Sequence, residues 1–484
     1  MAFIKEKCKK MEIIARKKEL TLLHRALEKK ESQFIAVYGR RRVGKTFLIR
    51  EAFTDKFCFS HTGYYNQSKK EQLAGFVKSL KKAGFSSDSE PVKNWADAFY
   101  QLESMIEQCN NSKKILFLDE ISWMDTQNSG FIPALEHFWN TFASARKDVI
   151  LIICSSATSW VIDNVIHSRG GFHNRLTLSI HLQPFTLAEV ETYIHSLDVP
   201  LTRMQILEGY MALGGVPYYW SHIEKGMSIT QYIDFLFYQK GALLQDEFLF
   251  LFQSLFKKPE VYLNIIHALS KKRKGLTRNE ILQATGCISS EGFSKKLTEL
   301  ESCDFIRIYT SYGKRKEKLY QLIDPFILFY YHFLEHRSMD MQFWMHHANT
   351  PLTNTWKGFA FELVCLLHVQ EMKERLGIAS VLTDVFSFSI QEDMENGIQG
   401  SQIDLVIKRA DKVTNILEMK YASEEYLITK AVDDSLRRKR SDFQRTTGTK
   451  DAIQMILVTP YGVIQNTYAS NLDFVLTAED LFIE

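Results

Sequence analysis

The sequence is poor in the features that mark disordered, fibrous and strongly charged proteins. Its 484 residues include only 9 prolines, and 60 basic against 57 acidic residues leave a formal net charge of +3. Hydrophobic residues make up 45% of the chain and charged residues 24%, the balance of an ordinary globular protein. The near-zero charge gives no overall basic excess for nucleic acid, although it leaves room for a local basic surface.

Cysteine and long apolar runs are also scarce. The seven cysteines are scattered and odd in number, so we expect reduced packing residues of a cytoplasmic protein. The most apolar run, residues 326–334, is far shorter than the ~20 residues that cross a bilayer, and the first residues lack the apolar stretch of a signal peptide. We therefore expect no membrane partner. The cysteines are Cys8, Cys58, Cys109, Cys154, Cys287, Cys303 and Cys365.

Four modules are expected along the chain. In residues 1–185, short apolar strands alternate with helical stretches, which is typical of an α/β fold with a parallel sheet. Residues 186–256 have helical periodicity and predict a helical lid. Residues 257–335 hold three helical patterns and a strand pair, the pattern of a winged helix-turn-helix, and residues 336–484 form a further module. The expected strands are 34–38, 115–118, 149–154, 179–182, 305–310, 319–323, 402–407, 416–421 and 455–458.

A glycine-rich motif follows the first expected strand. Residues 39–46 fit the P-loop pattern G-x-x-x-x-G-K-[ST], and a helical pattern comes next. The glycines let backbone N–H groups close around the β-phosphate of a nucleotide, and the helix start adds the positive end of its dipole. Lys45 is expected to reach the β- and γ-phosphate oxygens, and Thr46 to bind Mg²⁺. The residues assigned to nucleotide binding are Gly39, Arg40, Arg41, Arg42, Val43, Gly44, Lys45 and Thr46.

A second strand of the same module ends in two acidic residues. Residues 115–118 are apolar, and Asp119 and Glu120 follow them directly. In a P-loop enzyme, Asp119 would bind the nucleotide-bound Mg²⁺ through water. Glu120 would polarise the water that attacks the γ-phosphate, which favours hydrolysis over binding alone.

Two further residues are candidates for contact with the γ-phosphate. Ser155 ends the strand 149–154, and a polar residue there can sense the γ-phosphate; an ordinary strand-to-turn serine is an equally good interpretation. Arg175 precedes the next strand and is a candidate arginine finger, in cis or from a neighbouring subunit. Arg169 competes for that role, and a solvated arginine is the alternative for both.

Five motifs in this order resemble the archaeal-type ATPase family, of the STAND branch of AAA+-like P-loop proteins. The resemblance covers about residues 10–335 and implies ATP and Mg²⁺ as ligands. Arg16, Glu19 and Leu20 resemble the opening Arg-x-x-Glu-Leu of that family. The family usually has glycine where this chain has Asn174. The motifs are the P-loop, residues 118–123 (Leu-Asp-Glu-Ile-Ser-Trp), 154–157 (Cys-Ser-Ser-Ala), 182–185 (Leu-Gln-Pro-Phe) and 214–218 (Gly-Gly-Val-Pro-Tyr), the last resembling the family's lid motif.

Two strands of the last module carry charged residues among apolar ones. Asp404 lies in the strand 402–407, and Glu418 and Lys420 lie in the strand 416–421. Period-2 alternation places Glu418 and Lys420 on one face, and a hairpin would bring Asp404 to the same edge. Such charges are costly unless they have a function. A helical stretch upstream offers a further carboxylate, Glu362.

This arrangement resembles the PD-(D/E)xK nuclease core, a restriction-endonuclease-like α/β fold, in the domain of uncharacterised function that often follows archaeal-type ATPases. The resemblance covers about residues 350–460. It implies that Asp404, Glu418 and Glu362 bind Mg²⁺ or Mn²⁺ and that Lys420 positions or activates water. The alternative is a fold relic whose acids have no chemistry. The basic run 437–440 would grip a phosphate backbone or, equally, form a solvated helix face.

The sequence therefore predicts a cytoplasmic ATPase that gates a metal-dependent, DNA-acting enzyme. The main alternative is a nucleotide-dependent switch with an inactive tail, which binds a protein partner or DNA, or self-associates. A weaker alternative is a remodeller of other proteins. The winged helix would enter DNA through residues 289–296 and the basic tip 314–316, or would serve as a spacer or protein contact.

Overall fold

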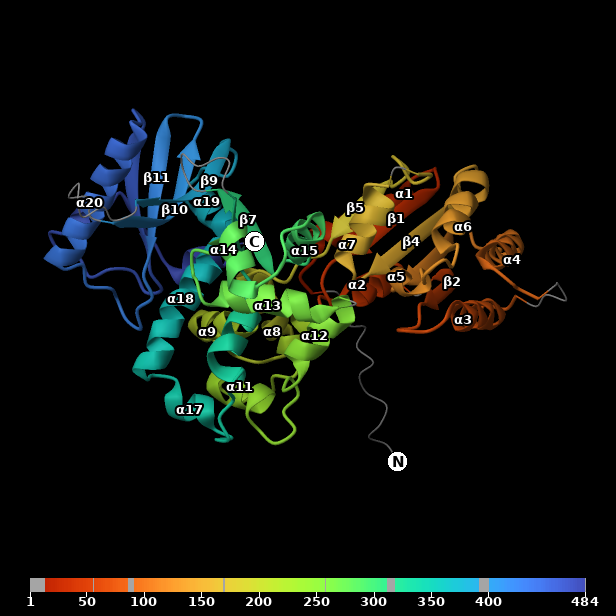
Figure 1. Cartoon of the computed structure of the whole chain (residues 1–484), viewed down its shortest axis with the longest axis horizontal. Coiled ribbons are helices and arrows are strands. Elements are labelled where there is room, and N and C mark those ends of the chain that lie inside the picture. Colours follow the sequence, from red (N-terminus) through yellow and green to blue (C-terminus); the bar gives the residue numbers. More distant parts are fainter. Residues whose placement is uncertain are drawn as a thin grey trace. The chain divides into compact units, whose positions relative to one another are not determined.

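The computed structural model describes residues 14–54, 56–85, 91–168, 170–256, 258–310, 318–390 and 400–483. The chain divides into two compact units, Met1–Gln183 and Pro184–Glu484. Figure 1 shows the first unit in red to yellow and the second in yellow-green to blue. Within the described ranges, no helix has both the length and the apolar character required to span a bilayer.

The first unit is built on a parallel sheet of five strands. The strand order is β2-β3-β4-β1-β5, and every neighbouring pair runs parallel. The four strands expected in this unit are present. The sequence pattern did not indicate β2, whose side chains are only partly buried. The strands are β1 (Gln33–Tyr38), β2 (Phe57–Thr62), β3 (Lys114–Asp119), β4 (Val149–Ser155) and β5 (Leu178–His181).

Helices cover both faces of this sheet because successive side chains of a strand point to opposite faces. Ile35 and Phe117 face one apolar cluster, which α1 and α2 complete. Phe34 and Leu118 face the other cluster, which is completed by α3, α4, α6, α7 and the two π-helices. The helices are α1 (Lys17–Glu28), α2 (Lys45–Ala52), α3 (Lys69–Lys82), α4 (Trp95–Gln108), α5 (Ile121–Met124), α6 (Phe131–His137), η1 (Phe138–Ala143), α7 (Thr158–Val161) and η2 (Ile162–Ile166).

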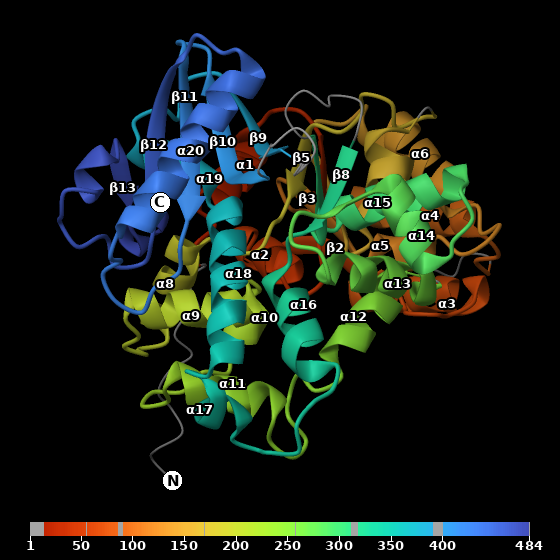
Figure 2. The same ribbon diagram turned by 60° about the vertical axis from the view of Figure 1, so that its left-hand side comes forward.

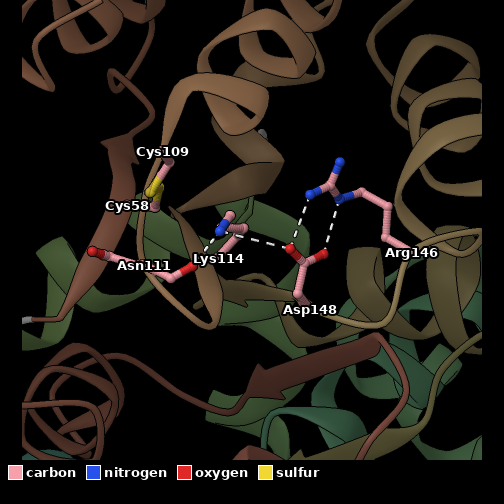
Figure 3. Close-up of a disulfide and its surroundings, with 6 residues drawn as sticks. All are labelled: Cys58, Cys109, Asn111, Lys114, Arg146 and Asp148. Carbon is pink, nitrogen blue, oxygen red and sulfur yellow. Dashed lines mark hydrogen bonds and ion pairs between the residues drawn. A yellow bond between two sulfur atoms is a disulfide. The ribbon is translucent and has the colours of Figure 1, made fainter.

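A disulfide and two ion pairs lie at the end of the sheet where β3 and β4 begin (Figure 3). Cys58 of β2 and Cys109, which follows α4, form a disulfide, so the expectation that all cysteines are reduced is wrong for this pair. Asp148 lies 2.9 Å from Arg146 and 3.7 Å from Lys114. All five strands run in the same direction, and the nucleotide motif follows the last residue of β1. The motif therefore lies at the opposite end of the strands.

The second unit begins with helices and a small antiparallel sheet. The order of this sheet is β6-β8-β7, and the three helices expected in residues 257–335 are present. The expected basic tip 314–316 lies outside the described residues. The elements are α8 (Leu187–Ser196), α9 (Arg203–Leu213), α10 (Pro217–Trp220), α11 (Ile229–Phe237), α12 (Glu247–Leu255), α13 (Pro259–Ser270), β6 (Leu276–Thr277), α14 (Arg278–Thr285), α15 (Glu291–Ser302), β7 (Ile306–Thr310), β8 (Lys318–Leu322), α16 (Pro325–Phe329) and the π-helix η3 (Tyr330–Leu334).

A mixed sheet of five strands follows. Its order is β13-β12-β11-β10-β9: the hairpins β9–β10 and β10–β11 are antiparallel, whereas β11, β12 and β13 run parallel. The helix α20 connects β11 to β12 and packs on one face of this sheet through Leu436 and Phe443. The elements are α17 (Phe343–His347), α18 (Pro351–Leu367), α19 (Val369–Arg375), β9 (Thr383–Ile390), β10 (Ser401–Arg409), β11 (Val413–Met419), α20 (Lys430–Thr447), β12 (Ala452–Val458), η4 (Ala469–Asn471), β13 (Phe474–Leu476) and η5 (Ala478–Leu481).

Candidate functional site

The glycine-rich motif forms the turn between β1 and α2. Gly39 has a φ of +144°, and a Cβ atom at this position would lie 2.2 Å from the carbonyl oxygen of Leu182. Gly44 is the N-cap of α2 in the left-handed region, with a φ of 91°. Both positions favour glycine, the first for space and the second for its backbone conformation. The turn therefore holds backbone N–H groups at the start of α2, which suits an anion.

The four residues between these glycines occupy different environments. Arg40 and Val43 are buried, Arg41 is exposed and Arg42 is half-buried. Arg42 has a φ of 70°, which a side-chain-bearing residue adopts rarely. The motif is thus a tightly folded turn rather than an extended loop.

The side chains of Lys45 and Thr46 make hydrogen bonds within the chain at the place where a nucleotide and its Mg²⁺ would bind. The Lys45 ammonium is buried and donates to the carbonyl oxygens of Gly39 and Arg40 at 2.8 and 2.9 Å. The Thr46 hydroxyl donates to Asp119 Oδ2 at 3.0 Å. Burial raises the pKa of Asp119, and the neighbouring Glu120 adds to the rise. A hydroxyl beside a buried carboxylate is a ligand pair that suits Mg²⁺.

Glu120 is held in an unusual backbone conformation beside this pair. Its φ of 46° and ψ of 47° place it in the left-handed region, where it caps α5. Its carboxylate accepts from the Ser156 hydroxyl at 2.6 Å and from the Ser156 N–H at 3.1 Å. Ser156 Oγ also lies 3.3 Å from Lys45 Nζ. Strained backbone of this kind is concentrated at functional sites.

Ser156 contacts this cluster, whereas the sequence pattern favoured its neighbour Ser155. Ser155 is fully buried, and its hydroxyl donates to Ser122 at 2.9 Å. The turn after β4 therefore directs Ser156, and not Ser155, to Lys45 and Glu120. The paired serines in the sequence were the available signal, but only the end of β4 decides between them.

Of the two arginines considered as fingers, Arg175 lies among the described residues. Arg175 is exposed in the turn before β5, and within the described part of the chain its side chain has no hydrogen bond or ion pair to the cluster. Arg169 lies outside the described residues. Asn174 has a φ of 55°. Asparagine is one of the residues that tolerate this region after glycine, which accounts for Asn174 where the family usually has glycine.

Two of the other ordered motifs have a structural explanation. The Arg16 guanidinium donates to the carbonyl oxygen of Gln183 at 2.7 Å, so the start of α1 is joined to the residues after β5. In the second unit, a Cβ atom on Gly215 would lie 1.8 Å from the carbonyl oxygen of Phe185. The Phe185 N–H donates to the Gly215 carbonyl at 2.6 Å. The glycine pair thus permits a close backbone contact between the segments at 185 and 215.

The second cluster of predicted residues lies in the mixed sheet. Asp404 is on β10 and Glu418 on the neighbouring β11, and both carboxylates are buried. The register of β10 against β9 shifts between Ile403 and Val406, so Asp404 lies in a β-bulge. Bulges are frequent beside active sites because they redirect a side chain. Asp404 Oδ2 accepts from the Met419 N–H at 3.3 Å.

Glu418 is paired with two lysines. Its Oε1 lies 2.8 Å from Lys420 Nζ, and its Oε2 lies 2.6 Å from Nζ of Lys439 on α20. Burial lowers the pKa of Lys420, but Glu418 outweighs this effect and the pKa is raised overall. Lys439, a member of the basic run 437–440, is thus joined to this cluster by an ion pair. Arg437 instead pairs with Asp433 of its own helix at 2.9 Å.

Asp404 and Glu362 show the cost of burying carboxylates together. Burial raises the pKa of Asp404 to about 7, with further contributions from Glu418 and Glu362. Burial also raises the pKa of Glu362, although an ion pair with Arg273 opposes it. Burial also lowers the pKa of Lys274, and the charges of Asp404 and Glu362 partly offset this shift.

The predicted three-carboxylate cluster is only partly assembled. No group of three or more histidine, cysteine, aspartate or glutamate side chains in the described part of the chain is arranged to hold a metal. Asp404 and Glu418 are neighbours, but the Glu362 carboxylate is engaged by Arg273. The role of Glu362 as a third carboxylate of a metal site with Asp404 and Glu418 stays a prediction. Arg273 is 89 positions away in sequence, and no pattern indicated it.

The fold and the first cluster together define the class of the first unit. A P-loop follows β1, a carboxylate pair ends β3, and the parallel sheet carries both at one edge. A family model described as an ATPase domain predominantly from Archaea matches residues 13–222. Residues 13–222 are therefore similar to this family, and the protein is a P-loop ATPase.

Other proteins are similar over larger parts of the chain. An uncharacterized protein of Methanocaldococcus jannaschii is 24% identical over 328 residues, which cover 66% of this chain and 68% of that protein. Among solved structures, a Walker-type ATPase of Pyrococcus abyssi is 15% identical with a TM-score of 0.47, covering 67% of this chain and 97% of that one. The ORC2 protein of Aeropyrum pernix is 12% identical with a TM-score of 0.40, covering 72% and 95%.

Proposed function

We propose that ATP binding and hydrolysis in the first unit control a metal-dependent, DNA-cleaving site in the second unit. The observation that carries the second half of this proposal is the cluster of Asp404, Glu418 and Lys420. Two buried carboxylates on adjacent strands, one of them in a bulge, are costly to the fold. A divalent cation would neutralise them, and the adjacent ammonium would orient the water that attacks a phosphodiester.

At the ATP site, the chain's own residues divide the work. Lys45 would leave the carbonyl oxygens of Gly39 and Arg40 and bind the β- and γ-phosphates. Thr46 and Asp119 fit Mg²⁺ because their oxygens already lie 3.0 Å apart. Glu120 would orient the attacking water. Ser156, which contacts both Lys45 and Glu120, would report the γ-phosphate to Glu120.

At the second site, Asp404 and Glu418 would hold Mg²⁺ or Mn²⁺. The fit rests on Asp404, whose carboxylate is buried beside Glu418 and Glu362 and has its pKa raised to about 7. The ion would supply Lewis-acid activation of the phosphodiester and of water. Lys420, 41% exposed and 2.8 Å from Glu418, is positioned to reach solvent and to orient the water.

Two fold assignments belong to this proposal. The mixed sheet with α18 and α20 supports a PD-(D/E)xK nuclease-like fold for about residues 350–460. Three helices and a three-stranded sheet support a winged helix for residues 257–335. The Arg278 guanidinium binds the hydroxyls of Ser289 and Ser294 at 2.9 and 3.1 Å, so these serines are engaged within the chain. This contact favours a spacer role for the winged helix over DNA reading.

The test is cleavage of supercoiled and linear DNA in Mg²⁺ or Mn²⁺, with and without ATP. Wild type is compared with Lys420→Ala and Lys45→Ala, and exposed Lys430→Ala on α20 is the matched control. We expect cutting that is lost in Lys420→Ala, retained in Lys430→Ala and insensitive to ATP in Lys45→Ala. Cutting by wild type that does not respond to ATP would remove the control by nucleotide. Cutting that persists in Lys420→Ala would remove the assigned site.

A second function is favoured by the ion pairs of Glu418. Both of its oxygens are neutralised by lysines, which is the arrangement expected of an inert site. The protein would then be a nucleotide-dependent switch that binds a partner, DNA or another copy of itself without cleaving DNA. Absence of any cutting, with ATPase activity intact, would support this function.

A further inference from the structure

A basic cavity lies beside the second site, within the second unit. Its volume is about 690 Å³, in the range of sites that hold small ligands. One wall is the turn Lys271–Lys274, between α13 and β6; the opposite wall includes Phe359 and Glu362 of α18. Gln402, two residues before Asp404, also lines it. The helix α13, which precedes this turn, and the elements α18 and β10, which carry the other three residues, are labelled in Figure 2.

Contacts to the main chain of the turn Lys271–Lys274 hold it in one conformation. Gly275 has a φ of +74°, and a Cβ atom there would lie 2.1 Å from the carbonyl oxygen of Tyr320. The Gln321 side-chain amide donates to the carbonyl oxygen of Arg273 at 2.7 Å. The Tyr309 hydroxyl donates to the carbonyl oxygen of Lys274. Four consecutive cationic residues are therefore presented from a fixed backbone, where their mutual repulsion cannot relax by chain movement.

The acids that line the cavity do not balance these cations. The lining acids are Glu335 and Glu362, against the four cations of the turn. Arg273 pairs with Glu362, and its guanidinium lies 4.3 Å from the centre of the Phe359 ring. Lys272 pairs with Glu280 at 2.6 Å, but both side chains are partly exposed to solvent, so this pair is weak. The cavity thus presents an excess of positive charge, as an anion site requires.

Aromatic residues border the same cavity. Tyr331 and Phe359 line it together with the basic turn. Cations along a groove combined with aromatic faces are the features that bind single-stranded nucleic acid, whose bases stack on the rings. A base-paired duplex is too bulky for a cavity of this size, whereas one or two unpaired nucleotides fit.

We propose that this cavity binds single-stranded DNA, with phosphates held by Lys271, Lys272 and Arg273 and bases against Tyr331 and Phe359. The strand would leave the cavity past Gln402 toward Asp404. This direction rests on the proposed nuclease function, whereas the binding itself does not. Occupation by a phosphate would compete with Glu362 for Arg273, so strand binding and the release of Glu362 are linked.

The test is binding of a fluorescent single-stranded oligothymidylate to the full chain in EDTA, followed by anisotropy over a range of salt concentrations. Lys271→Ala/Lys272→Ala removes two exposed cations of the turn. Lys78→Ala/Lys81→Ala on α3 removes two exposed lysines of a different basic groove and is the matched control. We expect at least about a tenfold weaker affinity for the first variant and less than about a twofold change for the control. The slope of log K against log salt should fall by about 1.4 for two lost phosphate contacts.

Each other outcome counts against the proposal. No binding by wild type, equal binding of a duplex of the same length, or an unchanged affinity in Lys271→Ala/Lys272→Ala would overturn it. The melting temperature of that variant is measured alongside, and Lys271→Gln/Lys272→Gln repeats the test with longer side chains if it falls. Because EDTA excludes metal-dependent cleavage, failure here is distinct from failure of the proposed nuclease, which is measured by cutting in Mg²⁺ or Mn²⁺.

Discussion

The raised pKa of Asp404 has a measurable consequence for stability. Its folded-state pKa of about 7 lies about 3 above the ordinary 3.8, because burial and the nearby Glu418 and Glu362 disfavour the charge. A carboxyl group whose pKa is raised on folding binds its proton more tightly in the folded state. The stability of the fold therefore falls as pH rises from about 4 through about 7. At about 1.36 kcal/mol for each pKa unit, the ceiling on this loss is about 4 kcal/mol.

The variant Asp404→Asn removes the titration while keeping the shape of the side chain. We expect the free energy of unfolding of the variant, minus that of wild type, to increase between pH 4 and 8 by up to about 4 kcal/mol. The measurement is urea unfolding in EDTA at several pH values. Burial lowers the pKa values of His61 and His368 to about 4, so these residues make the stability of both proteins rise with pH. Subtracting one protein from the other removes this shared contribution.

The control for this experiment is Asp411→Asn, in the exposed turn between β10 and β11. A hydrogen bond from Arg409 lowers the pKa of Asp411, so its removal should produce no slope between pH 5 and 8. Addition of Mg²⁺ above pH 7 should stabilise wild type more than Asp404→Asn, since the variant lacks one of the two carboxylates that would hold the metal in the second unit. A pH-independent difference between Asp404→Asn and wild type would refute the reasoning about this carboxylate.

Three further predictions concern both units. Glu120→Gln should reduce ATP hydrolysis by about 10²- to 10⁴-fold in a phosphate-release assay while ATP binding, measured by calorimetry, is retained. Gly215→Ala should destabilise the second unit by more than about 2 kcal/mol in thermal unfolding, because its Cβ would meet the Phe185 carbonyl at 1.8 Å. Gly226→Ala, which has open space but a φ of +90°, should cost less. His368 should contribute stability that is complete above pH 6.5 and lost as pH falls through about 4, since burial lowers its pKa; urea unfolding of His368→Ala should lack that slope.

The parts of the fold that sequence predicted are those whose pattern is unambiguous. The strands β1, β3 and β4 are buried on both faces, and their continuous apolar runs are typical of a parallel sheet. The P-loop pattern places its own turn, because glycine positions, strand and helix are adjacent in sequence. β2 is partly exposed and its composition is mixed, so no clear sequence signal marked it. In β9, apolar and polar residues alternate from Phe386 to Ile390, so a period-2 signal was available there.

The candidate sites were predictable where neighbours in sequence make them. Glu418 lies near the end of β11 and Lys420 directly follows that strand, and their ion pair follows from period-2 alternation. The pairs Arg273–Glu362 and Lys439–Glu418 join residues 89 and 21 positions apart, and tertiary packing alone brings them together. Whether Ser155 or Ser156 reaches the cluster depends on the residue at which β4 ends. A sequence pattern does not locate a strand end to within one residue.

The second unit is closed by contacts between its first and last segments, which sets an order of events during synthesis. Arg203 of α9 lies 2.6 Å from Glu479 of η5, and the Leu187 N–H donates to the His368 imidazole at 3.0 Å. Chains emerge from the ribosome from the N-terminal side at about 5–20 residues per second, and domains fold as they emerge. The ATPase sheet is complete by residue 183 and can form early. The contact between Arg203 and Glu479 can form only after residues 478–481 have been made, so the ATPase sheet can fold before the second unit is complete.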